Sequence, residues 1–173
     1  MGLVANALLF QFGWLACVLG GDRVAVPVAA ALLLLHWWFF SREAAEWLCI
    51  AFTVAIGVAL DITLESAGVL QFANDTPIPL WLVALWALFA TTLNHSLRWL
   101  QPHWAWAALL GAGAGPFSYW SGVQLDAAWF GIGTLAACGV LAACWGLLLP
   151  FLSAMMRRRY RVLSLCNPSS KQA

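Results

Sequence analysis

Charged residues are scarce in this chain. They account for 9% of its 173 residues, whereas 64% are hydrophobic, and the mean hydropathy is +0.86. A soluble fold needs a water-facing surface of polar groups, and this composition does not supply one. The composition therefore excludes an ordinary soluble domain and predicts a membrane protein whose first partner is the lipid bilayer.

The apolar runs also lack regular alternation of polar and apolar residues. A strand of a membrane barrel alternates in this way over about ten positions. Helices and closed barrels are the structures that satisfy every backbone amide within lipid. Because these runs are apolar on all sides, the sequence predicts helices rather than strands.

Paired cysteines and the sequence motifs of known active sites are missing as well. The five cysteines contain no C-x-x-C pair, and four of them lie inside apolar runs, where cysteine packs as a small apolar side chain. There is no nucleophile elbow, P-loop, dinucleotide glycine pattern, zinc motif or prenylation box. We therefore predict no disulfide, metal or cofactor, and the sequence leaves open whether the protein is an enzyme.

Six long apolar runs dominate the chain. Each has about 17–25 residues, enough at ~1.5 Å per residue to cross a hydrocarbon core of ~30 Å. The runs cover residues 3–20, 24–40, 47–64, 78–99, 104–121 and 127–152. We expect an all-α polytopic domain of six transmembrane helices over residues 1–165. A disordered cytoplasmic tail is expected over residues 166–173, which are small and polar.

The basic residues fall almost entirely in alternate gaps between the runs. Only Arg23 would lie on the side opposite the termini. The others are Arg42, Arg98, Arg157, Arg158, Arg159, Arg161 and Lys171. Because basic residues favour the cytoplasmic side, both termini are expected there. Most of the acids fall on the outer side, which disfavours nucleic acid as a partner.

The third run carries two carboxylates on one helical face. Thr53, Gly57, Asp61 and Glu65 follow one another at i, i+4 steps. Counted from Trp47, Asp61 lies ~21 Å along the helix, so it should face the bundle interior rather than lipid. The two acids suit a shared proton, a bound cation or an acid–base pair. The alternative is that the helix ends sooner and both are wet interfacial acids.

The fourth run contains the densest polar stretch, residues 91–98. Thr91, Asn94, His95 and Arg98 share one face, and Asn94 is expected in the inner leaflet. These side chains fit either hydrogen bonding between helices or a substrate or proton site. A metal site would need further ligands. His36 and His103 are the candidates, but they fall near the inner boundary, so no metal site is predicted.

Other polar residues are assigned from depth alone. Gln11 lies near the middle of the first run and is expected to meet the face that carries Asn94. Tyr119 and Asp126 lie at outer depth and are expected to meet Asp61 and Glu65. Together these residues form the predicted ligand-binding or proton-linked set.

The fifth run is rich in glycine. Gly111 and Gly115 form a G-x-x-x-G face, which lets another helix approach closely. Pro116 removes a backbone hydrogen bond and predicts a bend. We expect the tightest helix packing here.

Two further features concern the surface and the tryptophans. The segment 66–77 is the longest outer loop expected, which makes it the candidate lid or partner surface.

Nine of the twelve tryptophans fall at expected membrane boundaries, as in aromatic belts. The deeper Trp14, Trp86 and Trp145 are interpreted as packing groups rather than a cofactor cage.

Several short motifs are shared with a known family. They are Asn6, Phe10-Gln11, Gly13-Trp14, Asp61 before Gly68, Pro79-Leu80-Trp81, Leu85-Trp86, Phe89-Ala90-Thr91-Thr92-Leu93, Gly115-Pro116, Tyr119 and Gly122. On these residues the chain resembles a bacterial family of small inner-membrane proteins catalogued as a domain of unknown function. The resemblance implies a place in the bacterial inner (plasma) membrane and a role in the envelope, and it implies no activity.

Three functions remain open at this point. The first is a carrier or binder of a small or lipidic molecule, with Asp61, Glu65, Asn94 and His95 lining its interior. The second is an integral-membrane enzyme that modifies lipid, with Asp61 and Glu65 as acid and base. The third is an accessory subunit of a membrane complex, packed against a membrane protein partner through Gly111 and Gly115.

Overall fold

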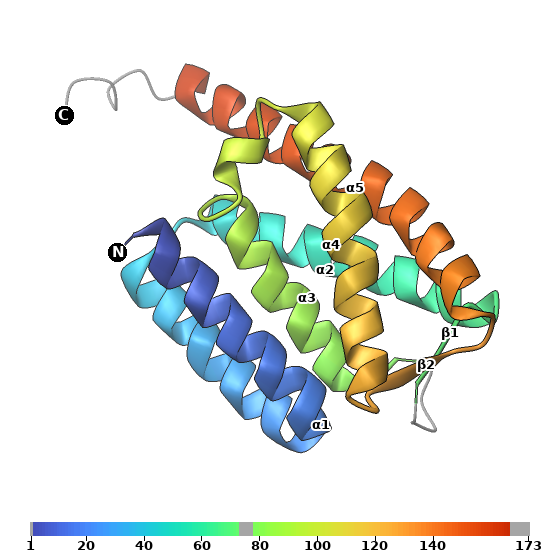
Figure 1. Ribbon diagram of the computed structural model, residues 1–173. Helices are drawn as coiled ribbons and strands as arrows, with labels where there is room; N and C mark the ends of the chain where they lie inside the picture. Colours follow the sequence, from blue (N-terminus) through green and yellow to red (C-terminus); the bar gives the residue numbers. More distant parts are fainter. Residues whose placement is uncertain (1, 73–77, 167–173) are drawn as a thin grey trace.

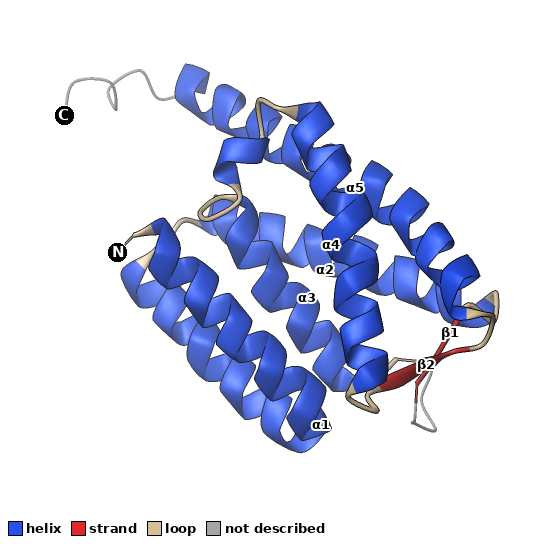
Figure 2. Ribbon diagram, viewed as in Figure 1, coloured by secondary structure: helices blue, strands red, loops and turns tan. Residues whose placement is uncertain are grey.

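The computed structural model describes residues 2–72 and 78–166, with side chains as far as Arg158. This part of the chain is helical apart from short connections (Figure 2). The helices are α1 (Leu3–Phe39), α2 (Ala44–Ser66), α3 (Leu80–Leu93), α4 (Trp104–Gln124) and α5 (Thr134–Cys166). A 3₁₀ turn covers Arg98–Leu100, and two short strands are β1 (Leu70–Phe72) and β2 (Ala128–Phe130). The all-α prediction is confirmed.

Helix α1 folds back on itself at Gly21. This residue has φ 55° and ψ −164°, a conformation that glycine adopts without the clash that a side chain would cause. The two halves of α1 then lie side by side (Figure 1). Gly13 in the first half leaves room for Leu32 in the second half. Each of the six apolar runs thus contains a helix, because the turn at Gly21 divides α1 into the first two. The helix predicted over 127–152 is wrong before Thr134, where the chain forms β2 and a turn.

The segment after Gly21 also holds the start of α3. The carboxylate of Asp22 accepts a hydrogen bond from the backbone N–H of Trp81 at 2.8 Å. The first N–H groups of a helix have no partner within it, so this carboxylate caps α3. Asp22, one of the acids expected on the outer side, therefore has a definite structural role.

Length and hydropathy identify fewer membrane spans than the sequence pattern predicts. Within the described residues, α1, α2 and residues 134–158 of α5 are long and apolar enough to cross a membrane. Helix α3 has only 14 residues, so this criterion does not support six crossings. The predicted helix over 78–99 is wrong beyond Leu93. There the polar side chains bond to other segments, and the backbone turns instead of continuing the helix.

The helices form two groups that the remaining contacts join. Helix α1 packs along α3, and α3 also packs against α2, whereas α4 packs mainly along α5 (Figure 1). Strands β1 and β2 pair antiparallel, with Leu70 opposite Phe130. The segment 66–77, predicted as a lid or partner surface, thus contains a strand paired to the chain just before α5. Residues 73–77 lie outside the described part.

The surface carries many large apolar side chains. Leu135 is 89% exposed, Leu147 76% and Trp104 76%. A soluble monomer rarely exposes so much apolar surface, and together with the three long apolar helices this is the character of a membrane protein. The start of α1 and the end of α5 lie toward the same end of the molecule (Figure 1). Of the predicted tail 166–173, only Cys166 belongs to the described residues.

Candidate functional site

Asp61 lies at the meeting point of three helices. Its side chain, on α2, is fully buried. The Tyr119 hydroxyl on α4 donates a hydrogen bond to Oδ1 at 2.6 Å. The indole N–H of Trp86 on α3 donates to Oδ2 at 2.6 Å. The predicted contact between Tyr119 and Asp61 is present, and the alternative that Asp61 is a wet interfacial acid is wrong.

Local sequence explains why Trp86 reaches this carboxylate. Gly57 lies one helical turn before Asp61, and a Cβ atom at Gly57 would overlap the Trp86 indole ring. Without that atom the indole lies directly against α2, with its N–H beside Asp61. Gly57 and Asp61, one helical turn apart, therefore position Trp86 together. The glycine lets the ring approach α2, and the carboxylate accepts its N–H.

The other face of Trp86 meets α5. Its ring stacks on Trp145, with centroids 5.2 Å apart and planes 6° from parallel. Trp145 in turn fills the space left by Gly111 and Gly115, where a Cβ atom would overlap its backbone carbonyl or its ring. The glycine face is thus the site of close helix packing, as predicted. The helix packed against it is α5 of the same chain.

Proline in α4 does not interrupt the helix. Pro116 is buried, and α4 continues as one helix from Trp104 to Gln124. Pro116 directly follows Gly115, so it lies on the part of α4 that packs closely against its neighbours.

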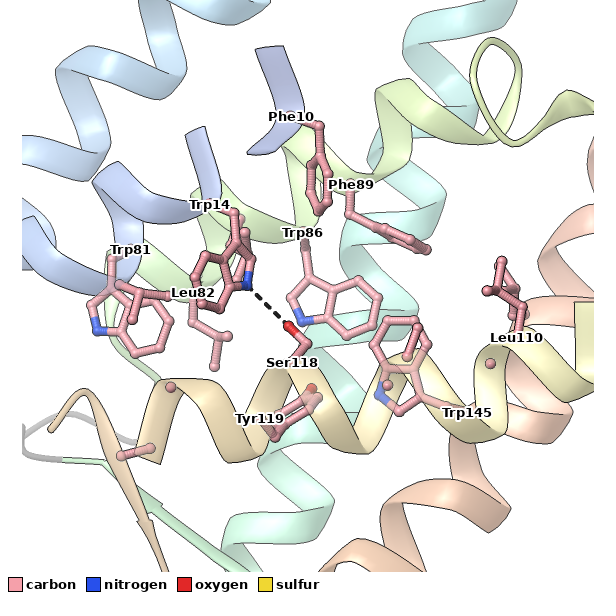
Figure 3. Close-up of a pocket in the computed structure, with 18 of the residues that line it drawn as sticks. Phe10, Trp14, Trp81, Leu82, Trp86, Phe89, Leu110, Ser118, Tyr119 and Trp145 are labelled. Carbon is pink, nitrogen blue, oxygen red and sulfur yellow. Dashed lines mark hydrogen bonds between the residues drawn. The ribbon is translucent and has the colours of Figure 1, made fainter. Parts of the chain in front are cut away.

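An apolar cavity of about 340 Å³ lies between the two groups of helices. Its walls come from α1, α3, α4 and α5, and aromatic side chains from these helices face one another across it (Figure 3). The aromatic lining consists of Phe10, Trp14, Phe72, Trp81, Trp86, Phe89, Tyr119 and Trp145. The indole N–H of Trp14 donates to the Ser118 hydroxyl at 2.9 Å, a bond that links α1 to α4 at the cavity wall (Figure 3).

Asp61 acts on this cavity through its two partners. Among the described residues, Trp86 and Tyr119 line the cavity and Asp61 does not. The carboxylate therefore lies behind the wall and fixes the orientation of two wall side chains. Sequence reasoning found Asp61 and Tyr119, but it assigned Trp86 to packing and did not predict the cavity.

Three of the predicted outer and mid-membrane residues lie elsewhere. Glu65 is partly exposed near the end of α2, and Asp126 is exposed in the turn after α4 with φ 59°. Neither takes part in the hydrogen bonds to Asp61. Gln11 is exposed on α1, so the expected contact between Gln11 and Asn94 is wrong.

Asn6 takes the place that was predicted for Gln11. Its carbonyl oxygen accepts bonds from the Ser96 N–H at 3.3 Å and the Ser96 hydroxyl at 2.8 Å. Five residues along a helix correspond to about 140° of rotation. Asn6 and Gln11 therefore point in different directions, and depth alone could not distinguish them.

A second polar cluster lies at the other end of α2, around Glu46. The Asn94 side-chain amide donates to Glu46 Oε2 at 2.9 Å. Nε2 of His95 and Nε2 of His36 lie 3.3 Å and 3.5 Å from Glu46 Oε1. Glu46 is 4% exposed. The structure thus brings Asn94 and His95 together, but with Glu46 and not with Asp61.

Glu46 was overlooked although a signal was present. It lies seven positions before Thr53, which places it on the same helical face as Gly57 and Asp61. That face is the buried one in the structure. Extending the polar stripe of α2 toward its start would have found Glu46.

Comparison with known proteins identifies a family without a known activity. The family model described as "Protein of unknown function (DUF2878)" matches residues 3–151. No curated protein and no solved structure matches the chain.

Proposed function

The chain belongs to the DUF2878 family of proteins of unknown function, and from its site we propose that it binds or carries a small, largely apolar molecule within a membrane. The aromatic cavity is the observation that carries this proposal. Its volume of about 340 Å³ falls in the usual range for small-molecule sites of ~300–1,000 Å³. The apolar lining and convergence of four helices are typical of such sites.

The chemistry of the walls favours an apolar ligand. Four indole rings and two of the phenylalanines come from helices, and they offer flat apolar surfaces. Two of the polar groups at the wall are already engaged, since the Tyr119 hydroxyl bonds to Asp61 and the Ser118 hydroxyl accepts from Trp14. The buried indole N–H of Trp145 has no partner among the described residues and is a single donor that a ligand could use. A sugar or an ion would leave its polar groups without partners here, at a cost of several kcal/mol. A hydrocarbon, isoprenoid or aromatic body would not.

The membrane setting of the proposal has six crossings with both termini in the cytoplasm. Support comes from the six helical segments and from the ends of the chain, which lie toward one end of the molecule. Arg42 and Arg98 follow segments that end on that same side, whereas Asp22 and Asp126 lie in turns on the other. Such charge bias favours cytoplasmic termini. The resemblance to a bacterial family favours the bacterial inner membrane and an envelope role.

The other two functions lack the support that the cavity gives to binding. An acid–base pair would need Asp61 and Glu65 to face the substrate, and neither is among the described residues that line the cavity. A partner helix would need the face of Gly111 and Gly115, which Trp145 of the same chain occupies. The binder is therefore preferred over the lipid-modifying enzyme and the accessory subunit.

Filling the cavity tests the proposal. The purified full-length chain in detergent is titrated with a dibrominated fatty acid, because bromine quenches the fluorescence of indoles that it touches. Ala114 lines the cavity, so Ala114→Phe should weaken binding by at least about tenfold. Ala105→Phe is the matched control, since Ala105 is exposed on the same helix and does not line the cavity.

Two outcomes decide the matter. Saturable quenching that Ala114→Phe removes and Ala105→Phe preserves would support an internal site. Quenching that is equal in both variants and the parent chain would come from lipid-facing tryptophans, and it would overturn the proposal. Mass spectrometry of hydrophobic molecules that co-purify with the parent chain, but not with Ala114→Phe, would identify the natural ligand.

A further inference from the structure

We propose that His36, Glu46 and His95 bind a divalent transition-metal ion such as Zn²⁺ or Fe²⁺. Each residue offers one ligand atom, and the three atoms all lie within 4.8 Å of one another. The residues come from the end of α1, the start of α2 and the turn after α3, so an ion would join three separate segments. This site is distinct from the aromatic cavity, whose described lining contains none of the three residues.

The spacing of the ligand atoms matches metal coordination. Zinc binds imidazole nitrogen and carboxylate oxygen at ~2.0–2.2 Å, which in a tetrahedral site places neighbouring ligand atoms ~3.3 Å apart. Glu46 Oε1 lies 3.3 Å from Nε2 of His95 and 3.5 Å from Nε2 of His36. The carboxylate oxygen thus already stands at the edge length of a coordination tetrahedron from both nitrogens.

The same three atoms lack hydrogen bonds. His36 Nε2, His95 Nε2 and Glu46 Oε1 are buried, and within the described part of the chain none has a partner with hydrogen-bond geometry. A buried polar atom without a partner costs about 1–3 kcal/mol. The oxygen lies at ion-pair distance from both nitrogens, and all three atoms lie within 4.8 Å of one another. A cation that accepts lone pairs from all three would give each of them a partner.

Neighbouring residues hold the ligands as outer partners do in metal sites. Asn94 donates to the second oxygen of Glu46 at 2.9 Å, which leaves Oε1 directed at the histidines. Gln101 donates to the Asn94 carbonyl oxygen at 3.2 Å and to the Leu93 backbone carbonyl at 3.1 Å. The ring of His36 stacks on Phe40, with centroids 5.4 Å apart. Outer contacts of this kind orient the ligands and tune the metal.

The donor set indicates which ions fit and what remains open. Two imidazoles and one carboxylate suit Zn²⁺ and Fe²⁺ rather than Ca²⁺ or Mg²⁺, which prefer oxygen ligands alone. Three protein ligands leave at least one coordination position for water or another molecule, unlike closed structural sites with four protein ligands. The His95 side chain is 20% exposed, whereas those of His36 and Glu46 are 4% and 3% exposed. An ion would therefore enter past His95.

Metal titration of the full-length chain tests this site. Protein purified in detergent and stripped with a chelator is titrated with Zn²⁺ by calorimetry and with Co²⁺ by visible absorption. We expect one ion per chain and a Co²⁺ spectrum of tetrahedral or five-coordinate type. Loss of an outer partner commonly weakens a metal site by ~10–100-fold, so Glu46→Gln or His95→Ala should weaken it by at least about 100-fold.

The control is another histidine of the same region. His103 is exposed, its Nδ1 lies 2.8 Å from the Trp99 backbone carbonyl, and it does not belong to the cluster. His103→Ala should therefore leave the affinity unchanged. Failure of the parent chain to bind Zn²⁺ or Co²⁺ at micromolar concentration would overturn the proposal. Equal weakening by His103→Ala and His95→Ala would also overturn it.

A measurement on the parent chain covers the case in which the variants do not fold. Diethyl pyrocarbonate modifies accessible imidazoles, and mass spectrometry locates the modified residues. Zn²⁺ should slow modification of His95 by at least about tenfold and leave His103 unaffected, because a coordinated nitrogen is no longer nucleophilic. Equal modification of His95 with and without Zn²⁺ would contradict the site.

Discussion

Helix α2 carries two buried carboxylates with opposite surroundings. Asp61 receives one hydrogen bond on each oxygen, from Tyr119 and Trp86. Glu46 receives one hydrogen bond from Asn94, and its other oxygen lies at ion-pair distance from two imidazole nitrogens, without hydrogen-bond geometry to either. A carboxylate whose oxygens are both satisfied is part of the scaffold, and here it orients the wall of a cavity. A carboxylate with one oxygen that lacks a hydrogen bond, beside two imidazole nitrogens, is suited to bind a metal ion.

The largest expected effect comes from removing the satisfied carboxylate. Asp61→Ala would leave the Trp86 N–H and the Tyr119 hydroxyl buried without partners, at about 1–3 kcal/mol each. The free energy of unfolding in detergent should therefore fall by roughly 2–6 kcal/mol. Asp61→Asn keeps one acceptor oxygen and should cost about half as much. If Asp61→Ala unfolds like the parent chain, the scaffold role assigned to Asp61 is wrong.

A crossed experiment on Glu46 and Asp61 sharpens the contrast between their sites. Glu46→Gln should abolish Zn²⁺ binding, with a loss of at least about 100-fold, and leave binding of the brominated fatty acid unchanged. Asp61→Asn should weaken binding of the fatty acid and leave the Zn²⁺ affinity unchanged. The reason is that the two carboxylates lie 15 positions apart, or ~22 Å along α2. If either variant weakened the binding of both ligands, the two sites would form one functional unit.

A smaller effect is expected from removing one of the two groups that donate hydrogen bonds to Asp61. Tyr119→Phe keeps the ring in the cavity wall and removes one hydrogen bond to a charged group, which is worth about 1.5–3 kcal/mol. Its stability should fall between those of Asp61→Ala and the parent chain. Chemical unfolding in detergent measures this. A loss as large as that of Asp61→Ala would mean that Tyr119 alone holds the carboxylate.

The smallest effect is expected at the edge of the cavity. Trp14→Phe removes the hydrogen bond between α1 and Ser118 on α4, a partly buried neutral pair worth about 0.5–1.5 kcal/mol. We expect little loss of stability but a change in fatty-acid affinity, because this bond links the two walls. Fluorescence titration compares Trp14→Phe with Trp104→Phe, whose ring is exposed and outside the cavity. Identical affinities would mean that the bond does not shape the site.

Much of the fold was predictable because its causes are local. The apolar runs predict helices wherever backbone groups must be satisfied in lipid, and each run is helical over most of its length in the structure. There are two exceptions. Residues 127–133 contain strand β2 instead of helix. In the stretch after Leu93, hydropathy alone extended a helix that Asn94, His95 and Ser96 end. These side chains bond to α1 and α2, and such distant partners leave no trace in a hydropathy pattern.

The candidate sites were predictable only in part, for the same reason. The spacing of Gly57 and Asp61 predicted a buried polar face on α2, and Asp61 lies there. The partners of Asp61 and Glu46 come from other segments, so Trp86 was assigned to packing, His36 to the inner boundary, and Glu46 was overlooked. Gln11 and Asp126 were included on depth alone, which does not tell which way a side chain points.

By itself the sequence determined a helical protein of membrane character and the buried polar face of α2. Hydropathy and helical periodicity are properties of short stretches, so one chain without relatives suffices to establish them. Only the tertiary structure decided which polar residues of different helices contact one another. Tyr119 reaches Asp61 across 58 positions, and two histidines from different segments meet at Glu46. Those contacts depend on how helices pack against one another, which no local pattern encodes.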